Sequence, residues 1–341
     1  MENLISGTRN AVLRGTEWLI RRQNVDGSFS DCGDELVSTY KAPLAFAVSG
    51  NTEAGVRCLQ YIKTHNLNGE GELSSSGGGA KTAFLNNQRS FANYMDGWVA
   101  IGAWLLGDFG FAARICERLL PQQAAHGGIL SGPKKWSGTP RYDVLTNASL
   151  GRAFLHTGMR DEAQSVADFL AQVVAPEHQR APEEGFDMSF DAEWKHVEPS
   201  DPKDRPYYRF LYSLRGERVF CPAFACAFLC EMAQLGNREK YLVAACKFLS
   251  VITRTPEFLD HSLANGKSGW AAGMLAVANS NVSAKQAALQ IMPKMLARQR
   301  EDGEFAAASG ADQTPLAKRL ESTAEHVAWA VEYQRLLTLG L

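Results

Sequence analysis

The sequence has no excess of basic residues and no long hydrophobic run, and it shows almost no strand pattern. Its 341 residues carry a formal net charge of −2, which gives no reason to expect a polyanionic partner such as nucleic acid. No stretch reaches about 18 uncharged apolar residues, and the first residues show no basic segment followed by an apolar run. We therefore expect a soluble protein without a membrane span or a secretory signal.

Cysteine is present but is not arranged for disulfides or metal binding. The count of seven is odd, and several cysteines, including Cys58, Cys116 and Cys246, lie among apolar residues with helical spacing. A reduced thiol in such a place behaves as a small hydrophobic side chain, which indicates a reducing, cytoplasmic compartment. Cys226 and Cys230 have no neighbouring Cys or His at ligand spacing, so we expect no zinc site.

The usual signatures of nucleotide, hydrolase and metalloprotease sites are missing as well. Residues 77–82 are similar to a phosphate-binding loop, but Ala80 stands where a glycine is needed and no strand precedes it. There is no Gly-x-Ser-x-Gly elbow and no His-Glu-x-x-His pair. We therefore expect no cofactor and no metal, and we interpret the glycine- and serine-rich stretch 69–80 as a flap beside a site.

Helical periodicity is what the sequence has in abundance. Apolar residues recur at three- and four-residue spacing in twelve segments, near 6–23, 35–49, 52–65, 93–107, 109–122, 143–157, 160–175, 220–235, 238–253, 268–279, 283–299 and 321–338. Strand patterns are limited to a short ribbon around 186–190 and 207–212. The links alternate between tight turns and long loops, so six hairpins packed side by side would carry all their long loops on one face.

Two kinds of helix alternate along the chain. One kind is nearly free of charge, as in 92–106 and 221–230, and the other has a single charged face, as in 160–170. An uncharged inner ring within a charged outer ring predicts an all-α, single-domain (α/α)6 toroid over residues 1–341. The connection at about 176–219, rich in proline and aromatic residues, is expected to be a lid-like insertion that folds over the cavity or against a second subunit, as in a homodimer.

One short pattern occurs near both ends of the chain. The helix at 6–23 runs into Gln23, Gly27 and Phe29, and the pattern returns as Gln299, Gly303 and Phe305, with a poorer copy from Gln122 to Gly127. The glycine permits a turn with positive φ, and the glutamine amide can bond the carbonyls at a helix end. Because the first helix is outer and the last is inner, we predict that 6–23 and 321–338 pack together, with both phenylalanines buried.

These residues carry a family resemblance. Together with Arg14, Gly15, Trp18 and Leu19, they resemble the QW repeat of squalene and oxidosqualene cyclases, with Phe29 in place of the usual tryptophan. The chain is thus similar to the toroid superfamily of terpenoid cyclases and protein prenyltransferases, which implies an enclosed cavity for a hydrophobic substrate. The Asp-x-Asp-Asp acid of the protonating cyclases and the aspartate-rich helix of the ionising synthases are absent. The zinc-binding Asp-x-Cys of the prenyltransferases is absent too, although His326 falls in the corresponding region.

The candidate site lies where the inner helices begin, because unpaired N–H groups and positive dipole ends converge there. The residues so placed are Asp34, Glu35, Ser38, Tyr40, Asn93, Tyr94, Asp96, Trp98, Tyr142, Asp143, Asn147, Cys221, Trp270, Ser322, Glu325 and His326. We predict catalytic roles for Asp96, Glu325, His326 and Cys221. Substrate-binding roles are predicted for Tyr40, Tyr94, Trp98, Tyr142, Asp143, Asn147 and Trp270.

Several of these residues also have a plainer interpretation. Asp34 and Asp143 stand where helix N-caps are expected. Cys221 precedes a proline at a helix start and fits a packed thiol. A buried histidine such as His326 is commonly satisfied by local bonds, whereas Asp96 lies in an otherwise uncharged helix where capping explains it less well.

The predicted function is a cofactor-independent cyclase, isomerase or lyase that uses general acid/base catalysis on a small hydrophobic molecule of terpenoid or polyketide type. One alternative is a carbohydrate-active hydrolase, lyase or epimerase, in which Asp96, Asp143, Asp187 and Asp191 would supply the acids. A second alternative is a binding module without catalysis, since a toroid can present its loop face to a partner.

Overall fold

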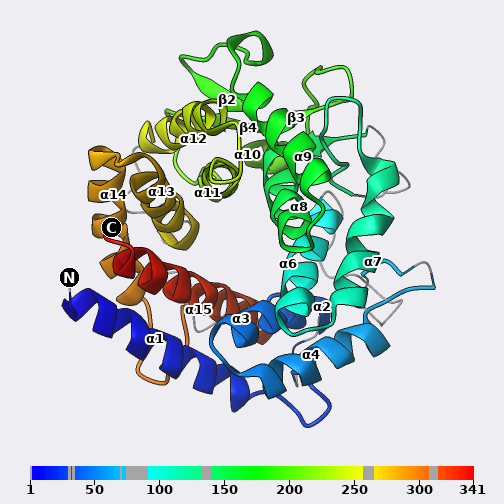
Figure 1. The fold of residues 1–341 in the computed structure, drawn as a ribbon, viewed down its shortest axis with the longest axis vertical. Coiled ribbons are helices and arrows are strands. Elements are labelled where there is room, and N and C mark those ends of the chain that lie inside the picture. The colour runs from blue at the N-terminus through cyan, green and yellow to red at the C-terminus, as the bar shows by residue number, and fades with distance from the viewer. Residues whose placement is uncertain are drawn as a thin grey trace.

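The computed structural model describes residues 2–29, 32, 35–69, 71–73, 91–132, 140–255, 265–306 and 314–341. Its helices form a ring of two layers, seen end-on in Figure 1. The outer layer contains α1 (Glu2–Ile20), α4 (Thr52–His65), α7 (Phe109–Leu119), α9 (Arg160–Val173), α12 (Arg238–Thr253) and α14 (Val282–Leu296). The inner layer contains α2 (Glu35–Thr39), α3 (Ala42–Val48), α6 (Ala92–Leu105), α8 (Val144–His156), α11 (Phe220–Met232), α13 (Asn265–Asn279) and α15 (Leu316–Thr338). Neighbouring inner helices pack together from α3 round to α15 and back to α3, so the predicted all-α toroid fold is confirmed.

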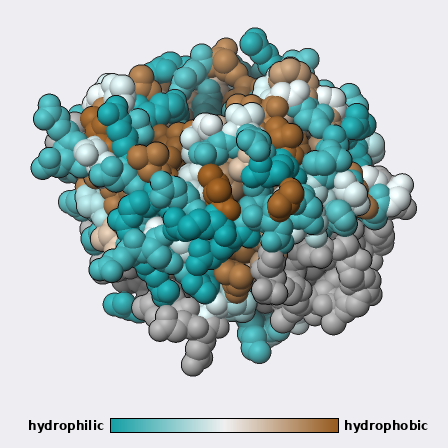
Figure 2. All heavy atoms as spheres, turned by 90° about the horizontal axis from the view of Figure 1, so that it is seen from below, coloured by the Kyte–Doolittle hydropathy of each residue, from teal (hydrophilic) through white to brown (hydrophobic). Residues whose placement is uncertain are grey.

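The two layers follow from the distribution of charge in the sequence. In α11 every residue except Phe220 and Glu231 is buried, as expected for a helix that is apolar on all sides. In α9 the buried residues recur at three- and four-residue spacing from Ala163 to Val173, and the charged residues face outward. Seen from the side of α1 and α4, the surface is mostly hydrophilic with separate hydrophobic spots (Figure 2).

The segment predicted as one helix at 35–49 is broken into α2 and α3. Pro43 occupies the first turn of α3, where its missing N–H has no partner to lose. In an unbroken helix its ring would meet the carbonyl of Thr39, so the chain has to start a new helix at this point. The break places Tyr40 and Lys41 between two short inner helices, and both side chains are buried.

The glutamine–glycine–aromatic pattern forms a turn that joins neighbouring outer helices. In the first copy Gln23 and Phe29 form a β-bridge, and Gln23 Nε2 donates to the carbonyl of Ala54 in α4 at 2.9 Å. Gly27 has φ of +90°, and a Cβ at this position would lie 2.1 Å from the carbonyl oxygen of Arg57. The turn therefore sits directly on the backbone of the next outer helix, which only glycine allows.

The last copy of this turn closes the ring. Gln299 bridges Phe305, and its Nε2 donates to the carbonyl of Ala11 in α1 at 2.8 Å. Gly303 has φ of +100°, and a Cβ there would lie 2.2 Å from the carbonyl oxygen of Arg14. Along its length α1 also packs against α15, as predicted for the meeting of the first and last helices.

The sequence-based description of these repeats needs two corrections and is otherwise accurate. The central copy begins at Gln123, which bridges Ile129, and not at Gln122. A fourth turn of the same shape joins Leu67 to Leu73. It was missed because leucine replaces the glutamine. Phe29 and Phe305 are both buried, as predicted.

The long connection between α9 and α11 has its own secondary structure. It contains η4 (Pro176–His178), β2 (Gly185–Asp187), β3 (Ser189–Phe190), η5 (Pro202–Asp204), α10 (Arg205–Tyr208) and β4 (Arg209–Leu211). Strands β2 and β4 pair antiparallel with Phe186 opposite Phe210, so the predicted ribbon is confirmed. Strand β3 pairs with β1 (Tyr142–Asp143), which was not predicted and attaches the insertion to the start of α8.

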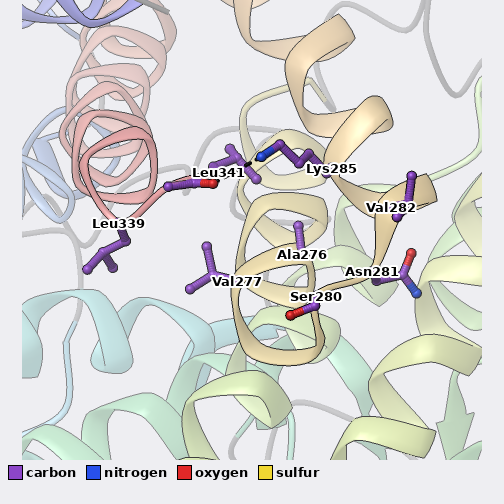
Figure 3. Close-up of a pocket in the computed structure, with 9 residues that line it drawn as sticks. Ala276, Val277, Ser280, Asn281, Val282, Lys285, Leu339 and Leu341 are labelled. Atoms are coloured by element: carbon purple, nitrogen blue, oxygen red, sulfur yellow. Dashed lines mark hydrogen bonds between the residues drawn. The ribbon is translucent and has the colours of Figure 1, made fainter.

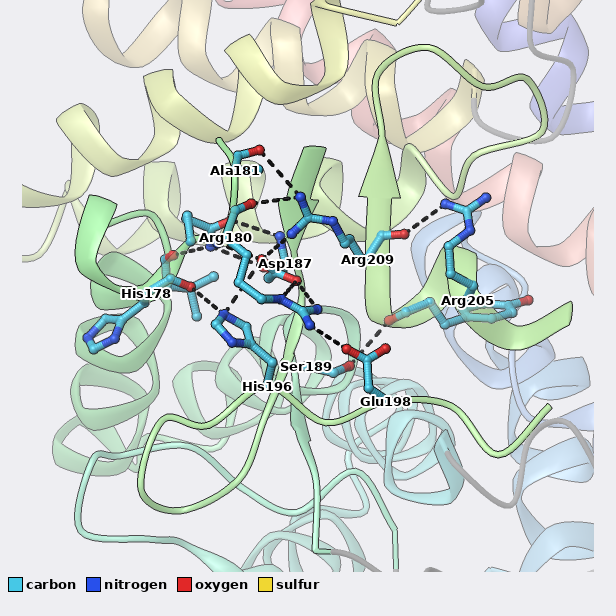
Figure 4. A network of polar contacts seen from close by, with 12 residues as sticks. His178, Arg180, Ala181, Asp187, Ser189, His196, Glu198, Arg205 and Arg209 are labelled. Carbon is cyan, nitrogen blue, oxygen red and sulfur yellow. Dashed lines mark hydrogen bonds and ion pairs between the residues drawn. The ribbon is translucent and has the colours of Figure 1, made fainter. Parts of the chain in front are cut away.

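A buried carboxylate fastens the two ends of this insertion together (Figure 4). Asp187 is 1% exposed and accepts hydrogen bonds from the backbone N–H of Arg180 at 2.9 Å and from Arg180 Nη2 at 2.7 Å. Arg209 Nη1 donates to Oδ2 of Asp187 at 2.5 Å. Burial acts to raise the pKa of Asp187, but the bonds from Arg180 and Arg209 outweigh it and lower the pKa.

We expect Asp187→Asn to loosen the insertion, because two arginines then face a neutral group inside the protein. Removing one partner of a buried ion pair typically costs about 3–5 kcal/mol. Hydrogen exchange and limited proteolysis of residues 176–219 should both speed up. The matched control is Glu198→Gln, which alters an exposed carboxylate paired with Arg180. This variant should cost less than about 1 kcal/mol. Equal protection in the two variants would contradict this account.

Ring closure is tested by Gly303→Ala. Positive φ alone costs a residue with a Cβ about 1–2 kcal/mol, and the contact with the Arg14 carbonyl should add a further 1–3 kcal/mol or so. The control is Gly50→Ala, because Gly50 also has positive φ but a Cβ there would meet nothing within 4 Å. Denaturant unfolding should show a larger loss for Gly303→Ala than for Gly50→Ala. Equal losses would mean that the close approach is unimportant.

Candidate functional site

A layer of aromatic side chains fills the middle of the inner ring. Neighbouring ring centroids are 4.7 to 6.5 Å apart, and the layer consists of Tyr40, Tyr94, Trp98, Phe224, Trp270 and Trp329. These residues come from the break before α3 and from α6, α11, α13 and α15. Four of them, Tyr40, Tyr94, Trp98 and Trp270, were predicted to lie together, and the structure does bring them together.

A cluster of buried charges lies against this layer on the side where the inner helices begin. Lys41 Nζ pairs with Glu321 at 2.9 Å and also with Glu325, and its side chain is only 4% exposed. Lys267 of α13 pairs with the other oxygen of Glu325. Lys318 Nζ lies 2.7 Å from Glu321 Oε2. Three lysines therefore surround two carboxylates that stand one turn apart on α15.

Hydrogen bonds join the charged cluster to the aromatic layer. Tyr40 donates its hydroxyl to Glu321, and Trp329 Nε1 donates to Glu325 Oε1 at 3.2 Å. Lys41 Nζ lies 5.1 Å from the centroid of the Trp98 ring, and Lys267 Nζ lies 5.8 Å from that of Trp329. The aromatic faces thus add cation–π attraction to the ion pairs that hold both ammonium groups.

The surroundings keep both carboxylates ionised. Burial acts to raise the pKa of Glu321, but Lys318 and Lys41 outweigh it and bring this pKa to about 2. Burial also acts against ionisation of Glu325, yet Lys267 and Lys41 hold its pKa well below the ordinary value. The two carboxylates in turn raise the pKa of Lys41 against the effect of burial. The cluster therefore offers bases and fixed cations, and neither carboxyl group is poised to give up a proton.

The hydroxyl of Tyr94, in the aromatic layer, is one uncommitted polar group that faces the charged cluster. Burial raises its pKa, while Lys267 and Lys41 act in the opposite direction, so both ammonium groups lie within electrostatic reach of it. In the described part of the chain it takes part in no hydrogen bond. The indole nitrogens of Trp98 and Trp270 are also buried without a hydrogen-bond partner there. Such donors are available to a bound molecule.

A second buried ion pair lies on the far side of the aromatic layer. Arg152 of α8 donates through Nε to both oxygens of Glu231 at 3.1 and 2.9 Å. Its guanidinium carbon is 4.6 Å from the centroid of Trp270, which stacks on Trp329 at 4.7 Å. The aromatic layer is therefore enclosed between two charged groups along the ring axis, and it separates the cluster from the tight-turn face.

Asp96 does not lie where the sequence suggested. It is on the side of α6 that faces the outer layer, and Oδ1 pairs with Arg118 Nη2 of α7 at 2.8 Å. Burial raises its pKa to about 6 in spite of this arginine. The expectation that Asp96 shares a cavity with His326 is therefore wrong in geometry, because an inner helix has an outward face as well as an inward one.

His326 also points away from the centre. Its Nδ1 donates to the carbonyl of Ser322 at 2.7 Å, and its Nε2 accepts from Arg298 at 3.2 Å. The ring stacks on Phe305 with centroids 5.1 Å apart. Burial and Arg298 lower its pKa to about 4. Glu325 and His326 thus lie on different sides of α15, and the histidine belongs to the closing turn.

The remaining predicted residues are engaged in structural contacts. Asp143 caps α8, with Oδ1 accepting from the N–H of Thr146 at 2.9 Å. Asn147 accepts from the N–H of Ile129 at 2.7 Å and donates to its carbonyl at 3.0 Å. Tyr142 pairs in β1 and meets the edge of His126, outside the aromatic layer.

Cys221 and the acids of the carbohydrate alternative are also accounted for. Burial raises the pKa of the Cys221 thiol, so it stays protonated at neutral pH and is a poor nucleophile. Asp187 is held in the insertion, and Asp191 Oδ1 accepts from the N–H groups of Glu193 and Lys195 in a turn. Asp34 and residues 74–80 of the expected flap lie outside the described residues.

The charged cluster and the aromatic layer together form what we call the central cluster, and sequence reasoning missed several of its members. They are Lys41, Phe224, Lys267, Lys318, Glu321 and Trp329. A signal was present for Glu321, because it precedes the predicted Glu325 by four residues in the same helix, and this spacing puts both carboxylates on one face. The lysines gave no such signal, since they come from other helices.

Other features of the described residues lie away from this cluster. A hollow of about 310 Å³ opens between the end of α13, the start of α14 and the C-terminal residues, on the tight-turn face (Figure 3). No group of three His, Cys, Asp or Glu side chains suited to a metal ion occurs within the described ranges. No helix in that part of the chain is both long enough and apolar enough to cross a bilayer.

The buried His326 leads to a prediction about the stability of the fold at acid pH. Its native pKa of about 4 is below the ordinary value of about 6.5, so the unfolded state binds a proton first as the pH falls. Stability should therefore be full above about pH 6.5 and decline toward pH 4, and His156, with a pKa also near 4, acts in the same direction. His326→Asn keeps a donor for Ser322 and should flatten the decline in a series of denaturant unfolding curves. An unchanged slope would contradict this assignment.

No protein-family model matches the sequence, and no curated protein matches it either. Solved structures do match in shape. A D-mannose isomerase aligns with a TM-score of 0.71 over 95% of this chain and 96% of its own, at 13% identity. Cellobiose 2-epimerase from Bacillus thermoamylovorans aligns with a TM-score of 0.69 over 96% and 99%, at 9% identity. The type II terpene cyclase MstE from Scytonema aligns with a TM-score of 0.61 over 97% and 99%, at 12% identity.

At these identities the likeness concerns the fold. It is shared with a sugar isomerase, a sugar epimerase and a terpene cyclase alike. The resemblance carried by the glutamine–glycine–aromatic turns is thereby confirmed at the level of the fold, and the chain is an (α/α)6 toroid of the kind found in these enzymes.

Proposed function

We propose that this protein is an enzyme that moves a proton at a carbon next to a carbonyl group, as an isomerase or epimerase does. The observation that carries the proposal is the pair of ionised carboxylates on α15, fixed among three lysines beside an aromatic layer. Proton abstraction next to a carbonyl needs a base and a cation that stabilises the resulting enolate oxygen. The central cluster supplies both kinds of group within direct contact of each other.

Glu325 is the base in this proposal. It takes the proton from the carbon, the C–H electron pair moves toward the carbonyl oxygen, and Lys41 and Lys267 stabilise the negative charge that forms there. A substrate oxygen between these ammonium groups competes with Glu325 for them, which raises the pKa of the carboxylate toward that of a working base. Return of a proton to the opposite face of the same carbon gives an epimer. Return to the neighbouring carbonyl carbon, with the hydroxyl proton of the first carbon moving to the oxygen of the second, gives the isomer. In this proposal Tyr94 assists the second step.

The aromatic layer suits a substrate with a ring or an apolar face. Indole and phenyl rings bind such faces by stacking, while the unpartnered indole N–H groups of Trp98 and Trp270 remain available for directed hydrogen bonds. The fold likeness to a D-mannose isomerase and a cellobiose 2-epimerase supports sugars as the first class of substrate to test. Aromatic or polyketide-like carbonyl compounds are the second class.

A cyclase is the other candidate, and one observation favours it. The faces of Trp98, Phe224 and Trp329 already hold the ammonium group of Lys267 at 5.8 to 6.0 Å, so they would also stabilise a carbocation. A cyclase that starts by protonation needs a neutral carboxylic acid, however. Both carboxyl groups of the cluster are held ionised, which favours the isomerase.

The proposal predicts carbon-bound deuterium exchange. The protein is incubated in D2O with a panel of aldoses, ketoses and uronates, and incorporation is followed by NMR and mass spectrometry. Glu325→Gln should lower the exchange rate by about 10²- to 10⁴-fold, the usual effect of losing a general base. Tyr94→Phe removes a hydroxyl that has no partner in the described part of the chain, so it should slow exchange without changing the melting temperature.

The matched control is Glu332→Gln, which alters a carboxylate further along the same helix, beyond the aromatic layer. Its exchange rate should equal that of the wild type. Full activity of Glu325→Gln would remove Glu325 from the mechanism. Cyclisation of a prenylated substrate by the wild type, with no exchange into any carbonyl compound, would favour the cyclase.

A further inference from the structure

The insertion between α9 and α11 contains several arginines whose positions are explained by their partners. Arg180 and Arg209 bind Asp187 (Figure 4). Arg205 pairs with Glu217 at 2.5 Å. At the edge of the insertion, Arg254, which follows the last residue of α12, donates to the carbonyls of Pro182 and Glu183, both at 3.0 Å. Each of these guanidinium groups therefore holds part of the protein together.

Arg218, at the end of the same insertion, is different. Its guanidinium carbon lies 4.8 Å from the ring centroid of Tyr207, and its Nε is buried without a hydrogen-bond partner. No ion pair joins it to a carboxylate in the described ranges, and the neighbouring Glu217 is already paired with Arg205. The charge of Arg218 acts on the carboxyl groups of Asp204 and Glu217, but neither is in direct contact with it. A half-buried guanidinium of this kind is costly, because its Nε has lost water without gaining an acceptor.

Arg218 lies beside the central cluster. It comes three residues before Cys221, at the start of inner helix α11, and its charge acts on the thiol of Cys221 together with that of Lys267. The hydroxyl of Tyr207 is within electrostatic reach of Arg218 on one side and of Glu321 on the other. Tyr207 also meets Phe220, and Lys267 Nζ lies 5.2 Å from the Phe220 ring centroid. A continuous set of contacts thus leads from Arg218 to the lysines.

We infer that Arg218 is an oxyanion-binding residue at the edge of the central cluster, and that it holds a carboxylate or phosphate group carried by the substrate. This inference rests on the proposed function for the position of the reacting carbonyl near Glu325. A planar guanidinium presents two parallel N–H donors that match both kinds of oxyanion, and its stacking on Tyr207 fixes the plane of the fork. The substrate class is then an acidic or phosphorylated carbonyl compound, such as a uronate or a sugar phosphate.

Binding can be measured without turnover. The probes are D-glucuronate, D-glucose 6-phosphate, inorganic phosphate and neutral D-glucose, titrated into the full chain by calorimetry. The wild type should bind at least one anionic sugar more tightly than glucose. Arg218→Met should weaken binding of that anionic sugar by roughly 10-fold or more, as for the loss of a charge-assisted pair, and leave glucose unchanged. Arg218→Lys, which keeps the charge but loses the fork, should fall between the two.

Arg215→Met is the matched control, because it removes an exposed arginine from the same loop and the same charge from the protein. It should bind as the wild type does, and the melting temperatures of the Arg218 variants should agree with that of the wild type. The ratio of glucuronate to glucose 6-phosphate affinity tells which oxyanion the site prefers. Equal affinity of the wild type for glucose and both anions, or unaltered anion binding by Arg218→Met, would overturn the inference.

The two proposals fail separately. Loss of anion binding in Arg218→Met together with full deuterium exchange in Glu325→Gln would keep the oxyanion site and remove the base. Loss of exchange in Glu325→Gln with normal anion binding in Arg218→Met would keep the isomerase and remove the role of Arg218.

Discussion

The closure of the ring is the constraint on which the rest of the structure depends. Gly303 brings the turn after α14 onto the carbonyl of Arg14, and Gln299 ties that turn to the backbone of α1. Because α1 packs along α15, this contact fixes the last inner helix next to the first ones. The two ion pairs of Lys41 cross the same seam, since Lys41 lies before α3 and its partners Glu321 and Glu325 lie on α15. A chain that failed to close would separate Lys41 from both carboxylates.

The charges at the centre are tolerable only as a group. A buried carboxylate or ammonium costs several kcal/mol in lost hydration, and attraction offsets that cost only when partners are in direct contact. Here each carboxylate touches two lysines, and aromatic faces cover the ammonium groups. An arrangement of this kind holds cations beside ionised carboxylates, which suits stabilisation of a new negative charge better than delivery of a proton. The aromatic layer gives the same place an affinity for rings and apolar surfaces.

The insertion shows how the same residue type serves structure in one place and is available for binding in another. Arg180, Arg205 and Arg209 are saturated by Asp187, Glu217 and backbone carbonyls. Arg218 has the same chemistry and no such partners in the described ranges. The difference lies in position: the saturated arginines join the strands of the insertion to each other, and Arg218 stands where the insertion returns to the inner ring.

The sequence by itself determined the toroid, its alternation of inner and outer helices, the closing turns and the aromatic character of the centre. The spacing of apolar residues and the positions of turn glycines are local properties of the chain, so they can be recognised in the sequence without coordinates. Only the tertiary structure decided which side chains face the axis. Glu325 and His326 are adjacent, yet one joins the lysines and the other the closing turn; Asp96 turns outward to Arg118. An inner helix is buried on every side, and the periodicity that marks the inward face of an amphipathic helix is therefore absent from it.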